Sequence, residues 1–148
     1  MKLLLAVDIH DEPEAVLAEG CRWAERLAGV LDVAFVDEYQ HQQFLVDSLT
    51  VRSLVDEEWT RIQTANRDAL QALAARILPD HVRGEVLYLT GRAADAIVEA
   101  ARTRDVVLVS TRGRRGLGRA LRGSVAERVV RRAAIPVITF RASASGSS

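Results

Sequence analysis

The chain has 148 residues, a length that fits one ordinary domain, and its 49% hydrophobic and 27% charged residues exclude a disordered or membrane-embedded class. The formal net charge is zero, but ten arginines and only two acids lie between Arg102 and Arg132. That segment would attract an anion, although its composition equally fits a solvated helix face that pairs with the acidic first forty residues.

The first half of the sequence predicts two strands and two helices. A short apolar run predicts a strand over 2–8, and apolar residues at helical spacing predict a helix over 12–30. The run 31–37 predicts a second strand, and a long helix follows over 51–78 and ends at Pro79. The opening apolar run is too short for a signal peptide or a membrane span, so we expect a cytoplasmic protein.

The second half continues this alternation. It predicts strands over 84–90, 105–111 and 135–140, separated by a helix over 93–102 and another that begins near Ser124. Strands that alternate with helices indicate a parallel sheet that is covered on both faces. We therefore expect an α/β fold, a doubly wound five-stranded parallel sheet of order 3-2-1-4-5.

This strand order places a ligand site between the first and fourth strands, where the order switches direction. Asp8 ends the first strand and Ser110 ends the fourth, so both are candidate site residues. Asp8 also fits a simpler role as a carboxylate that caps the first helix. The domain is expected to span 1–140, and the polar residues 141–148 are expected to form a disordered tail.

Apolar spacing predicts which helix faces are buried. The single cysteine, Cys21, shares a helical face with Leu17 and Ala24, so it is interpreted as a core residue rather than a reactive thiol. Val125, Val129 and Val130 mark the apolar spacing of the last helix. The expected stripe of the long helix consists of Leu54, Val55, Trp59, Ile62, Ala65, Ala69, Leu73 and Ile77.

Glycine, arginine and hydroxyl side chains fill the segment between the fourth strand and the last helix. Gly113 and Gly116 let the backbone approach a ligand closely, because no Cβ intervenes. Gly123 and Ser124 stand at the start of the last helix, where backbone amides form a site for phosphate. Ser124 and Glu127 also form a capping box, which fits a plain helix start. The two interpretations are compatible.

The spacing of these residues resembles a known signature. From Ser110 through Gly113 to Gly123 and Ser124 there are two and then nine intervening residues, as in the nucleotide-binding signature of the universal stress protein family. The stretches LLAVDIHDEP, VAFVDE, GRAADAIVEAA and GSVAERVVRRAAIPVITF are similar to further parts of that family, so the resemblance covers nearly the whole chain. It implies a Rossmann-like fold of the adenine nucleotide alpha hydrolase type.

The resemblance also implies an adenine nucleotide ligand, namely ATP with Mg²⁺. Carried over to this sequence, it implies that Asp8 and the backbone at Ala6 and Val36 contact the adenosine, with Val36 reading the adenine edge. It implies further that Ser110 and Gly113 approach the ribose and the phosphates.

The family pattern assigns the phosphates to the start of the last helix. Gly123, Ser124 and Val125 would hold them through backbone amides and the serine hydroxyl. Arg114 and Arg115 would add positive charge near the phosphates. An equally good interpretation is that both are solvated side chains on a loop.

Two residues depart from the family signature. Ser110 stands where the first glycine is expected, and Arg112 stands where a histidine is common. Serine presents its backbone almost as closely as glycine where no positive φ is needed, so weaker binding is expected. Ser110 therefore keeps an alternative open, a dimeric interaction module of the same family that binds no nucleotide.

No catalytic residue is assigned. A phosphate loop of the type G-x-x-x-x-G-K-[ST] is missing from the sequence, and His10, His41 and His81 lack metal-ligand spacing. Any ATP hydrolysis is expected to be slow and incidental. Nucleic acid is not an expected partner, because no aromatic residue interleaves with the arginines between Arg102 and Arg132.

The fifth strand predicts association. It is apolar and lies at a sheet edge, and such edges tend to be paired or covered. The family pattern implies a homodimer through this strand, whereas Pro136 and the tail offer another way to guard the edge. The sequence therefore predicts a dimeric nucleotide-sensing regulator of the stress response.

Overall fold

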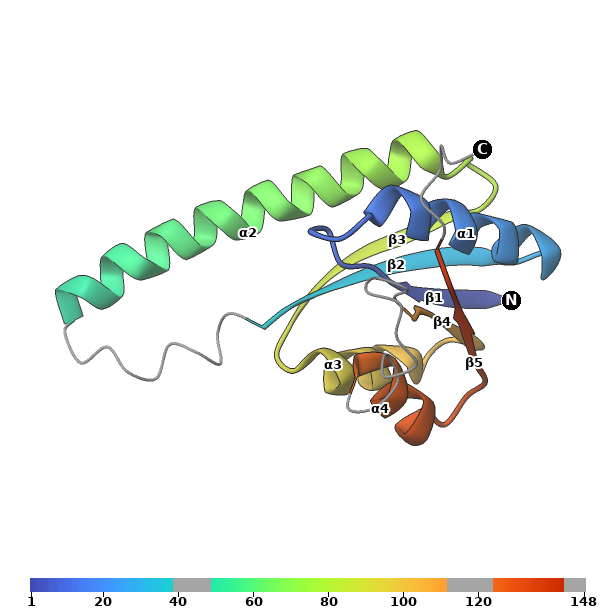
Figure 1. Ribbon diagram of the computed structural model, residues 1–148. Helices are drawn as coiled ribbons and strands as arrows, with labels where there is room; N and C mark the ends of the chain where they lie inside the picture. Colours follow the sequence, from blue (N-terminus) through green and yellow to red (C-terminus); the bar gives the residue numbers. More distant parts are fainter. Residues whose placement is uncertain (39–48, 112–123, 143–148) are drawn as a thin grey trace.

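The computed structural model describes residues 1–38, 49–111 and 124–142, and within these it leaves the side chains of 49–55 undescribed. Five strands form one parallel sheet in the order β3-β2-β1-β4-β5, which confirms the predicted fold class (Figure 1). The strands are β1 Lys2–Ala6, β2 Val30–Asp37, β3 Arg83–Thr90, β4 Val106–Ser110 and β5 Val137–Phe140. The helices are α1 Pro13–Arg26, α2 Leu49–Ile77, α3 Ala93–Ala101 and α4 Val125–Arg132.

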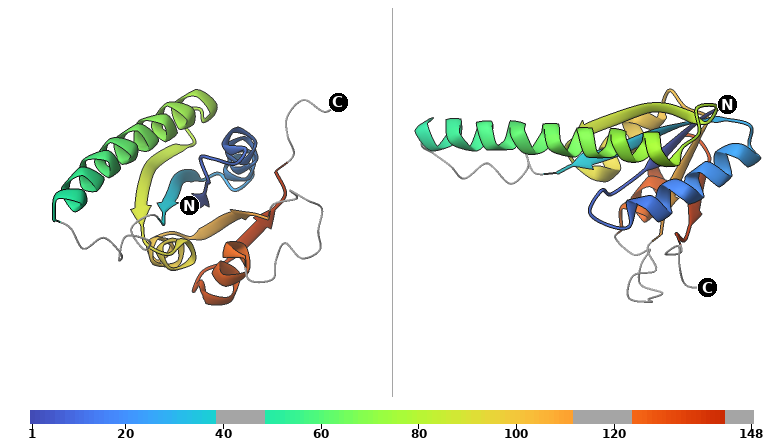
Figure 2. Two further views of the ribbon diagram at one scale, coloured as in Figure 1. Left: turned by 60° about the vertical axis from the view of Figure 1, so that its left-hand side comes forward. Right: turned by 90° about the horizontal axis from the view of Figure 1, so that it is seen from above.

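The sheet is the middle of three layers. Helices α1 and α2 cover one face, and α3 and α4 cover the other (Figure 2). Adjacent residues of β1 alternate between the two cores: Leu3 and Leu5 face α1 and α2, and Leu4 faces α3 and α4. All three leucines are fully buried. This double burial explains why the strands read as continuous apolar runs in the sequence.

Helix α1 ends four residues before the predicted end at Val30. Gly29 donates a backbone hydrogen bond to the Ala24 carbonyl at 2.9 Å, and Ala28 donates one to Glu25 at 3.2 Å. These two bonds form a Schellman motif, in which Ala28 takes the left-handed conformation, with a φ of 50°, that glycine usually adopts. The prediction was wrong because an alanine in this place gives no stop signal. Cys21 is half-buried against the core, as expected, and burial raises the pKa of its thiol.

The buried face of α2 differs from the predicted stripe. Leu70 and Ala74 are buried in the core, as is Leu78 just after the helix, whereas Ile62 is 42% exposed and Ala65 is also exposed. Figure 1 shows the reason for part of this, because α2 projects well past the sheet and leaves its early turns without a layer beneath them. Of the other predicted stripe residues, Trp59 is buried, Ala69 is exposed, and Leu73 and Ile77 are half-buried. The side chains of Leu54 and Val55 lie outside the described part of the structure.

The predicted apolar face of helix α4 is confirmed at Val129 and wrong at Val125 and Val130. Ala126 and Val129 are buried against β4 and α3, whereas Val125 is 37% and Val130 is 50% exposed. A helix that packs on a sheet by one narrow stripe buries residues three apart, and apolar neighbours outside that stripe stay in solvent.

A polar cluster interrupts the sheet at the β2–β3 bulge. The register shifts between Leu31 and Val33, and the buried carboxylate of Asp32 accepts the Glu85 backbone N–H at 2.7 Å. Arg104 donates through Nε to the same carboxylate at 3.0 Å, and its side chain is only 11% exposed. A Cβ at Gly84 would lie 2.2 Å from Asp32 Oδ1, so this position requires glycine. The carboxylate therefore satisfies a backbone donor that the bulge removes from the ladder.

Candidate functional site

Strand β1 ends at Ala6, before either of its neighbours ends, and this difference creates a recess. The β1–β2 ladder ends at Ala6 and Ala34, and the β1–β4 ladder ends at Ala6 and Val109. Strand β2 continues to Asp37 alongside β3, and β4 continues to Ser110 alongside β5. The recess lies at the switch of strand order, as the sequence predicts.

A cavity of about 610 Å³ opens from this recess, a volume within the range of about 300–1,000 Å³ that is usual for ligand pockets. Consecutive residues of β2 line it, and consecutive side chains of a strand point to opposite faces, so the cavity reaches both faces of the sheet. The α3/α4 chamber, on one face, is lined by Ala6, Ala34, Val36, Ile97, Val109 and Ser124. The α1/α2 chamber, on the other, is lined by Val7, His10, Val16, Phe35, Trp59 and Asn66.

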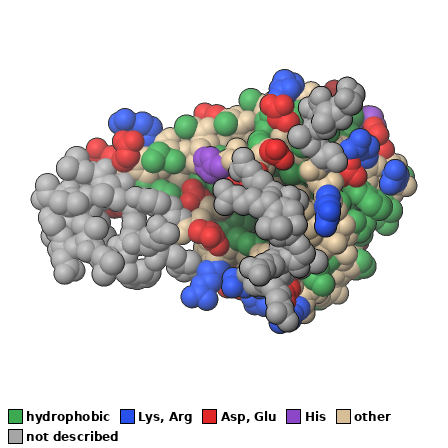
Figure 3. Space-filling model, viewed as in Figure 1, with side chains coloured by type: hydrophobic (Ala, Val, Ile, Leu, Met, Phe, Trp, Pro, Cys, Tyr) green, Lys and Arg blue, Asp and Glu red, His purple; other side chains and the backbone are tan. Residues whose placement is uncertain are grey.

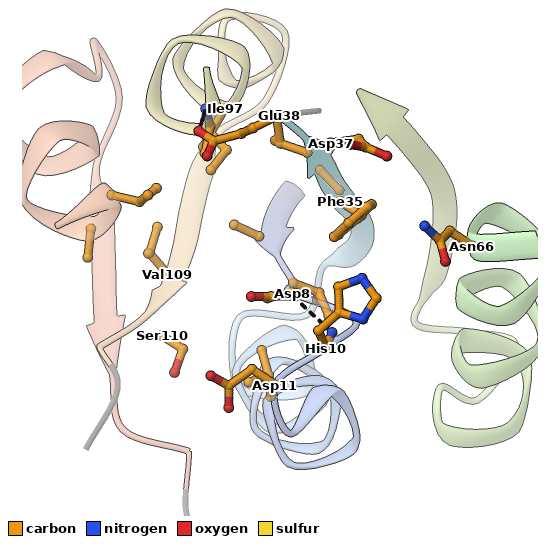
Figure 4. A pocket seen from close by; sticks show the side chains of 18 of the residues that line it. Asp8, His10, Asp11, Phe35, Asp37, Glu38, Asn66, Ile97, Val109 and Ser110 are labelled. Atoms are coloured by element: carbon orange, nitrogen blue, oxygen red, sulfur yellow. Dashed lines mark hydrogen bonds between the residues drawn. The ribbon is translucent and has the colours of Figure 1, made fainter. Parts of the chain in front are cut away.

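Six of the ten predicted site residues line the cavity. They are Ala6, Asp8, Val36, Ser110, Ser124 and Val125. The other four, Gly113, Arg114, Arg115 and Gly123, lie outside the described residues. The lining residues that the sequence reasoning missed include His10, Asp11, Asp37, Glu38 and Asn66, and several of these follow the ends of β1 and β2 in the sequence (Figure 4).

The backbone of Val36 faces the recess. The Ala34 carbonyl accepts a hydrogen bond from Val7 at 2.8 Å, so Ala34 directs its backbone groups toward β1. Alternate residues of a parallel strand direct these groups to the same neighbour, so Val36 also directs its N–H and C=O to that side. The β1 ladder has already ended there. Val36 therefore presents a donor and an acceptor to whatever occupies the recess.

Asp8 shapes the turn between β1 and α1. Its carboxylate accepts the backbone N–H of His10 at 2.9 Å, and its carbonyl accepts that of Asp11 at 3.1 Å (Figure 4). The cap position of α1 is held by Glu12, whose side chain makes no capping hydrogen bond. The Asp8 side chain is exposed at the mouth of the cavity.

The start of α4 lies on the opposite wall. The Ser124 hydroxyl accepts the backbone N–H of Glu127 at 3.2 Å, which confirms the serine half of the predicted capping box. Ser124, Val125 and Ala126 all line the cavity, so the positive end of the helix dipole is directed at it.

The described walls of the cavity are acidic. They contain the carboxylates of Asp8, Asp11, Asp37 and Glu38, and no lysine or arginine lines the cavity in 1–38, 49–111 or 124–142. Figure 3 shows acidic side chains and one histidine gathered around the hollow, with apolar side chains at depth. Glu38 accepts the backbone N–H of Ala93 at 2.7 Å and so caps α3 from another element.

A hydrogen-bonded network lies beside the α1/α2 chamber. The hydroxyl of Tyr88 donates to the buried carboxylate of Asp37, and the amide side chain of Asn66 lies near the same hydroxyl. Burial and the hydrogen bond to Asp37 raise the pKa of Tyr88 to about 12. The ring of Tyr88 packs against that of Phe35 at 5.4 Å between centroids, and the guanidinium of Arg67 covers it at 5.5 Å.

We expect the free energy of unfolding to fall as the pH rises from 10 to about 12. The folded protein holds the Tyr88 proton more tightly than the unfolded chain, so the stabilisation is complete below pH 10 and is lost as the pH passes the raised pKa. The decrease of the denaturant midpoint with pH across this range should be smaller in Tyr88→Phe than in the wild type, and part of it should remain because the pKa of the Cys21 thiol is also raised. An equal slope in Tyr88→Phe and wild type would contradict the assignment.

Two classes of site are not seen in the described part of the chain. Among those residues, no group of three or more His, Cys, Asp or Glu side chains is arranged to hold a metal ion. In the same residues, no helix combines the length and the apolar character needed to cross a membrane.

Known proteins resemble this chain over nearly its full length. A universal stress protein of Thermus aquaticus, described as lying in the QAH/OAS sulfhydrylase 3′ region, is 29% identical over 145 residues, which cover 94% of this chain and 97% of the relative. The structure of a universal stress protein in complex with cAMP matches with a TM-score of 0.63 at 19% identity, over 97% of this chain and 98% of that one.

A universal stress protein from Archaeoglobus fulgidus in complex with dAMP matches with a TM-score of 0.53 at 20% identity, over 95% of this chain and 98% of that one. At identities of 19% and 20%, these two matches support the fold alone. The family model described as the universal stress protein family matches residues 1–141, almost the full length of the chain. The chain therefore belongs to the universal stress protein family.

Proposed function

We propose that this protein binds an adenine nucleotide, namely ATP with Mg²⁺, in the cavity at the carboxyl ends of β1, β2 and β4. The observation that carries the proposal is the recess left where β1 ends before β2 and β4, because it exposes the Val36 backbone opposite the start of α4. A purine needs a donor and an acceptor at its edge, and phosphates are favoured at a helix N-terminus. Two structures of the same fold are complexes with cAMP and dAMP, which supports this choice of ligand.

The nucleotide would lie across the recess. Its adenosine would contact Asp8 and the backbone of Ala6 and Val36, with Ser110 near the ribose. The carboxylate of Asp8 suits this end, because it accepts hydrogen bonds from hydroxyl groups and would repel a phosphate.

The phosphates would extend toward Ser124 and Val125. Gly113 and Gly123, the two glycines of the nucleotide-binding signature, would also approach the phosphates. The segment 112–123 contributes five arginines and no acid, Arg114 and Arg115 among them, and these would balance a triphosphate. Mg²⁺ would be held mainly by the phosphates, as is usual for this ion.

We assign no catalytic residue. The proposed role is regulatory: a cytoplasmic homodimer, paired through the edge strand β5, whose nucleotide occupancy changes the shape of the loops around the cavity. Light scattering measures the dimer, and a mass of one chain at micromolar concentration would contradict it.

We expect Ser124→Asp to weaken ATP binding by about tenfold to a hundredfold, because a carboxylate would repel the phosphates at the start of α4. Aspartate caps a helix as well as serine does, so α4 should remain folded. Isothermal titration of nucleotide-stripped protein with Mg-ATP and with adenosine measures the effect, and only ATP should lose affinity.

The matched control is Ser124→Asn, which also caps the helix but carries no charge. It should bind ATP nearly as well as the wild type. Equal ATP affinity in both variants and wild type would place the phosphates elsewhere in the cavity.

A second candidate function is an interaction module that binds no nucleotide. The acidic described walls of the cavity and Ser110 in place of the signature glycine favour it. The same titration separates the two, since the module would give no heat with any nucleotide.

A further inference from the structure

The α1/α2 chamber is suited to a flat aromatic group. Phe35 and Trp59 are each 7% exposed and give it apolar ring walls. The ring of His10 stands edge-on to Phe35 at 6.2 Å between centroids, with 80° between the planes. His10 and Ile62 are exposed, so the chamber opens to solvent on that side. Aromatic walls of this kind favour a planar ring as the occupant.

Asn66 is the amide side chain of this chamber. It lies on α2, is half-buried and lines the cavity, and Figure 4 shows it projecting from the helix beside strand β3, on the same side of the view as Phe35 and His10. An amide offers one oxygen acceptor and two N–H donors, so its chemistry toward a ligand depends on which way it is turned.

The neighbouring network determines that orientation. Tyr88 has a single hydroxyl proton and donates it to the carboxylate of Asp37. The oxygen of Tyr88 can then only accept, so the nearby amide of Asn66 would be favoured with its nitrogen turned toward the hydroxyl. This leaves the side-chain oxygen and the second N–H of Asn66 for a ligand.

That pair of groups fits one edge of adenine. The exocyclic amine of adenine donates, and the adjacent ring nitrogen N7 accepts, and asparagine bonds both in nucleic-acid recognition. A base with a keto group at the same place presents two acceptors and would face the asparagine oxygen without a proton between them. Val36 would bond a different edge of the base, so the two roles are compatible.

We propose that Asn66 is a specificity-determining residue that selects the amine-bearing edge of adenine, in the orientation that Tyr88 and Asp37 impose on its amide. This inference rests on the nucleotide binding proposed above. It makes Tyr88 a positioning residue, which acts on the ligand only through Asn66.

The test compares ATP with inosine triphosphate, which replaces the amine of adenine by a keto group. Both are titrated, with Mg²⁺, into nucleotide-stripped wild type, Asn66→Leu and Tyr88→Phe. The wild type should bind ATP at least about tenfold more tightly than inosine triphosphate. Asn66→Leu should bring the ratio to within about twofold by weakening ATP alone, and Tyr88→Phe should narrow it because the amide is free to turn.

The matched control is Gln63→Leu, a similar change one turn earlier on α2 at a residue that does not line the cavity. It should keep the wild-type ratio. Should Asn66→Leu fail to fold, Asn66→Ala makes the same comparison.

The outcomes separate the two proposals. A wild-type ratio near one, or a wild-type ratio retained in Asn66→Leu, would overturn the role of Asn66 while ATP binding itself stands. If neither nucleotide binds the wild type, the proposed function and this inference both fail.

Discussion

Replacing Arg104 with methionine is expected to lower the free energy of unfolding by about 3–5 kcal/mol. The substitution removes the guanidinium that bonds Asp32 at 3.0 Å and leaves a carboxylate that is only 3% exposed without its countercharge. Arg104 also donates to the Ala100 carbonyl at 2.8 Å, so the turn before β4 loses a second bond. Urea denaturation followed by circular dichroism measures the change.

The matched control is Arg102→Met, on the same turn. The Arg102 side chain is 71% exposed and pairs with exposed Glu99, so its loss should cost at most about 1 kcal/mol. A double variant, Asp32→Asn with Arg104→Met, should recover much of the loss, because asparagine is neutral and can still accept the Glu85 N–H. A double variant no more stable than Arg104→Met would show that the buried charge is not the cause.

Replacing Ala6 with phenylalanine is expected to abolish nucleotide binding, a loss of at least about a hundredfold. Ala6 is the last residue of β1, is half-buried and lines the α3/α4 chamber. A phenyl ring there would occupy the recess between β2 and β4 and separate a ligand from the Val36 backbone. Because the ring enters an open cavity, it need not displace the core.

Titration with Mg-ATP measures the loss, and thermal unfolding checks that the fold is retained. Ala72→Phe is the control, since Ala72 is exposed on α2 and does not line the cavity. ATP affinity that survives in a folded Ala6→Phe protein would show that the nucleotide lies outside the recess.

The sequence predicted the strand order and the position of the cavity because both follow from simple regularities. Apolar runs separated by helical patterns leave few topologies for a parallel sheet, and the switch point of that sheet places Asp8 and Ser110 near each other. The helix start at Ser124 followed from its capping residue, and the family resemblance added Ala6, Val36 and Val125; all four line the cavity.

Several features depended on contacts that no local pattern contains. The end of α1 was missed because Ala28, not a glycine, holds the left-handed position. The buried face of α2 was misplaced because the helix extends past the sheet, so that Leu70 and Ala74 are buried while Ala65 and Ala69 are exposed. Asn66 was missed as a cavity residue because an apolar stripe cannot reveal a polar side chain. Its orientation depends on Tyr88 and Asp37, which are distant in sequence.

The cap that Glu38 provides to α3 has a consequence for how the protein folds. Helix α3 has nine residues, and isolated helices of fewer than about 12–15 residues are only marginally stable in water. Its own N-cap residue, Arg92, makes no side-chain capping hydrogen bond. The first turn of α3 is instead tied to a carboxylate 55 positions earlier in the chain. The first turn of α3 therefore gains this cap only where the chain that follows β2 is in place, so we expect the start of α3 and the end of β2 to become ordered together.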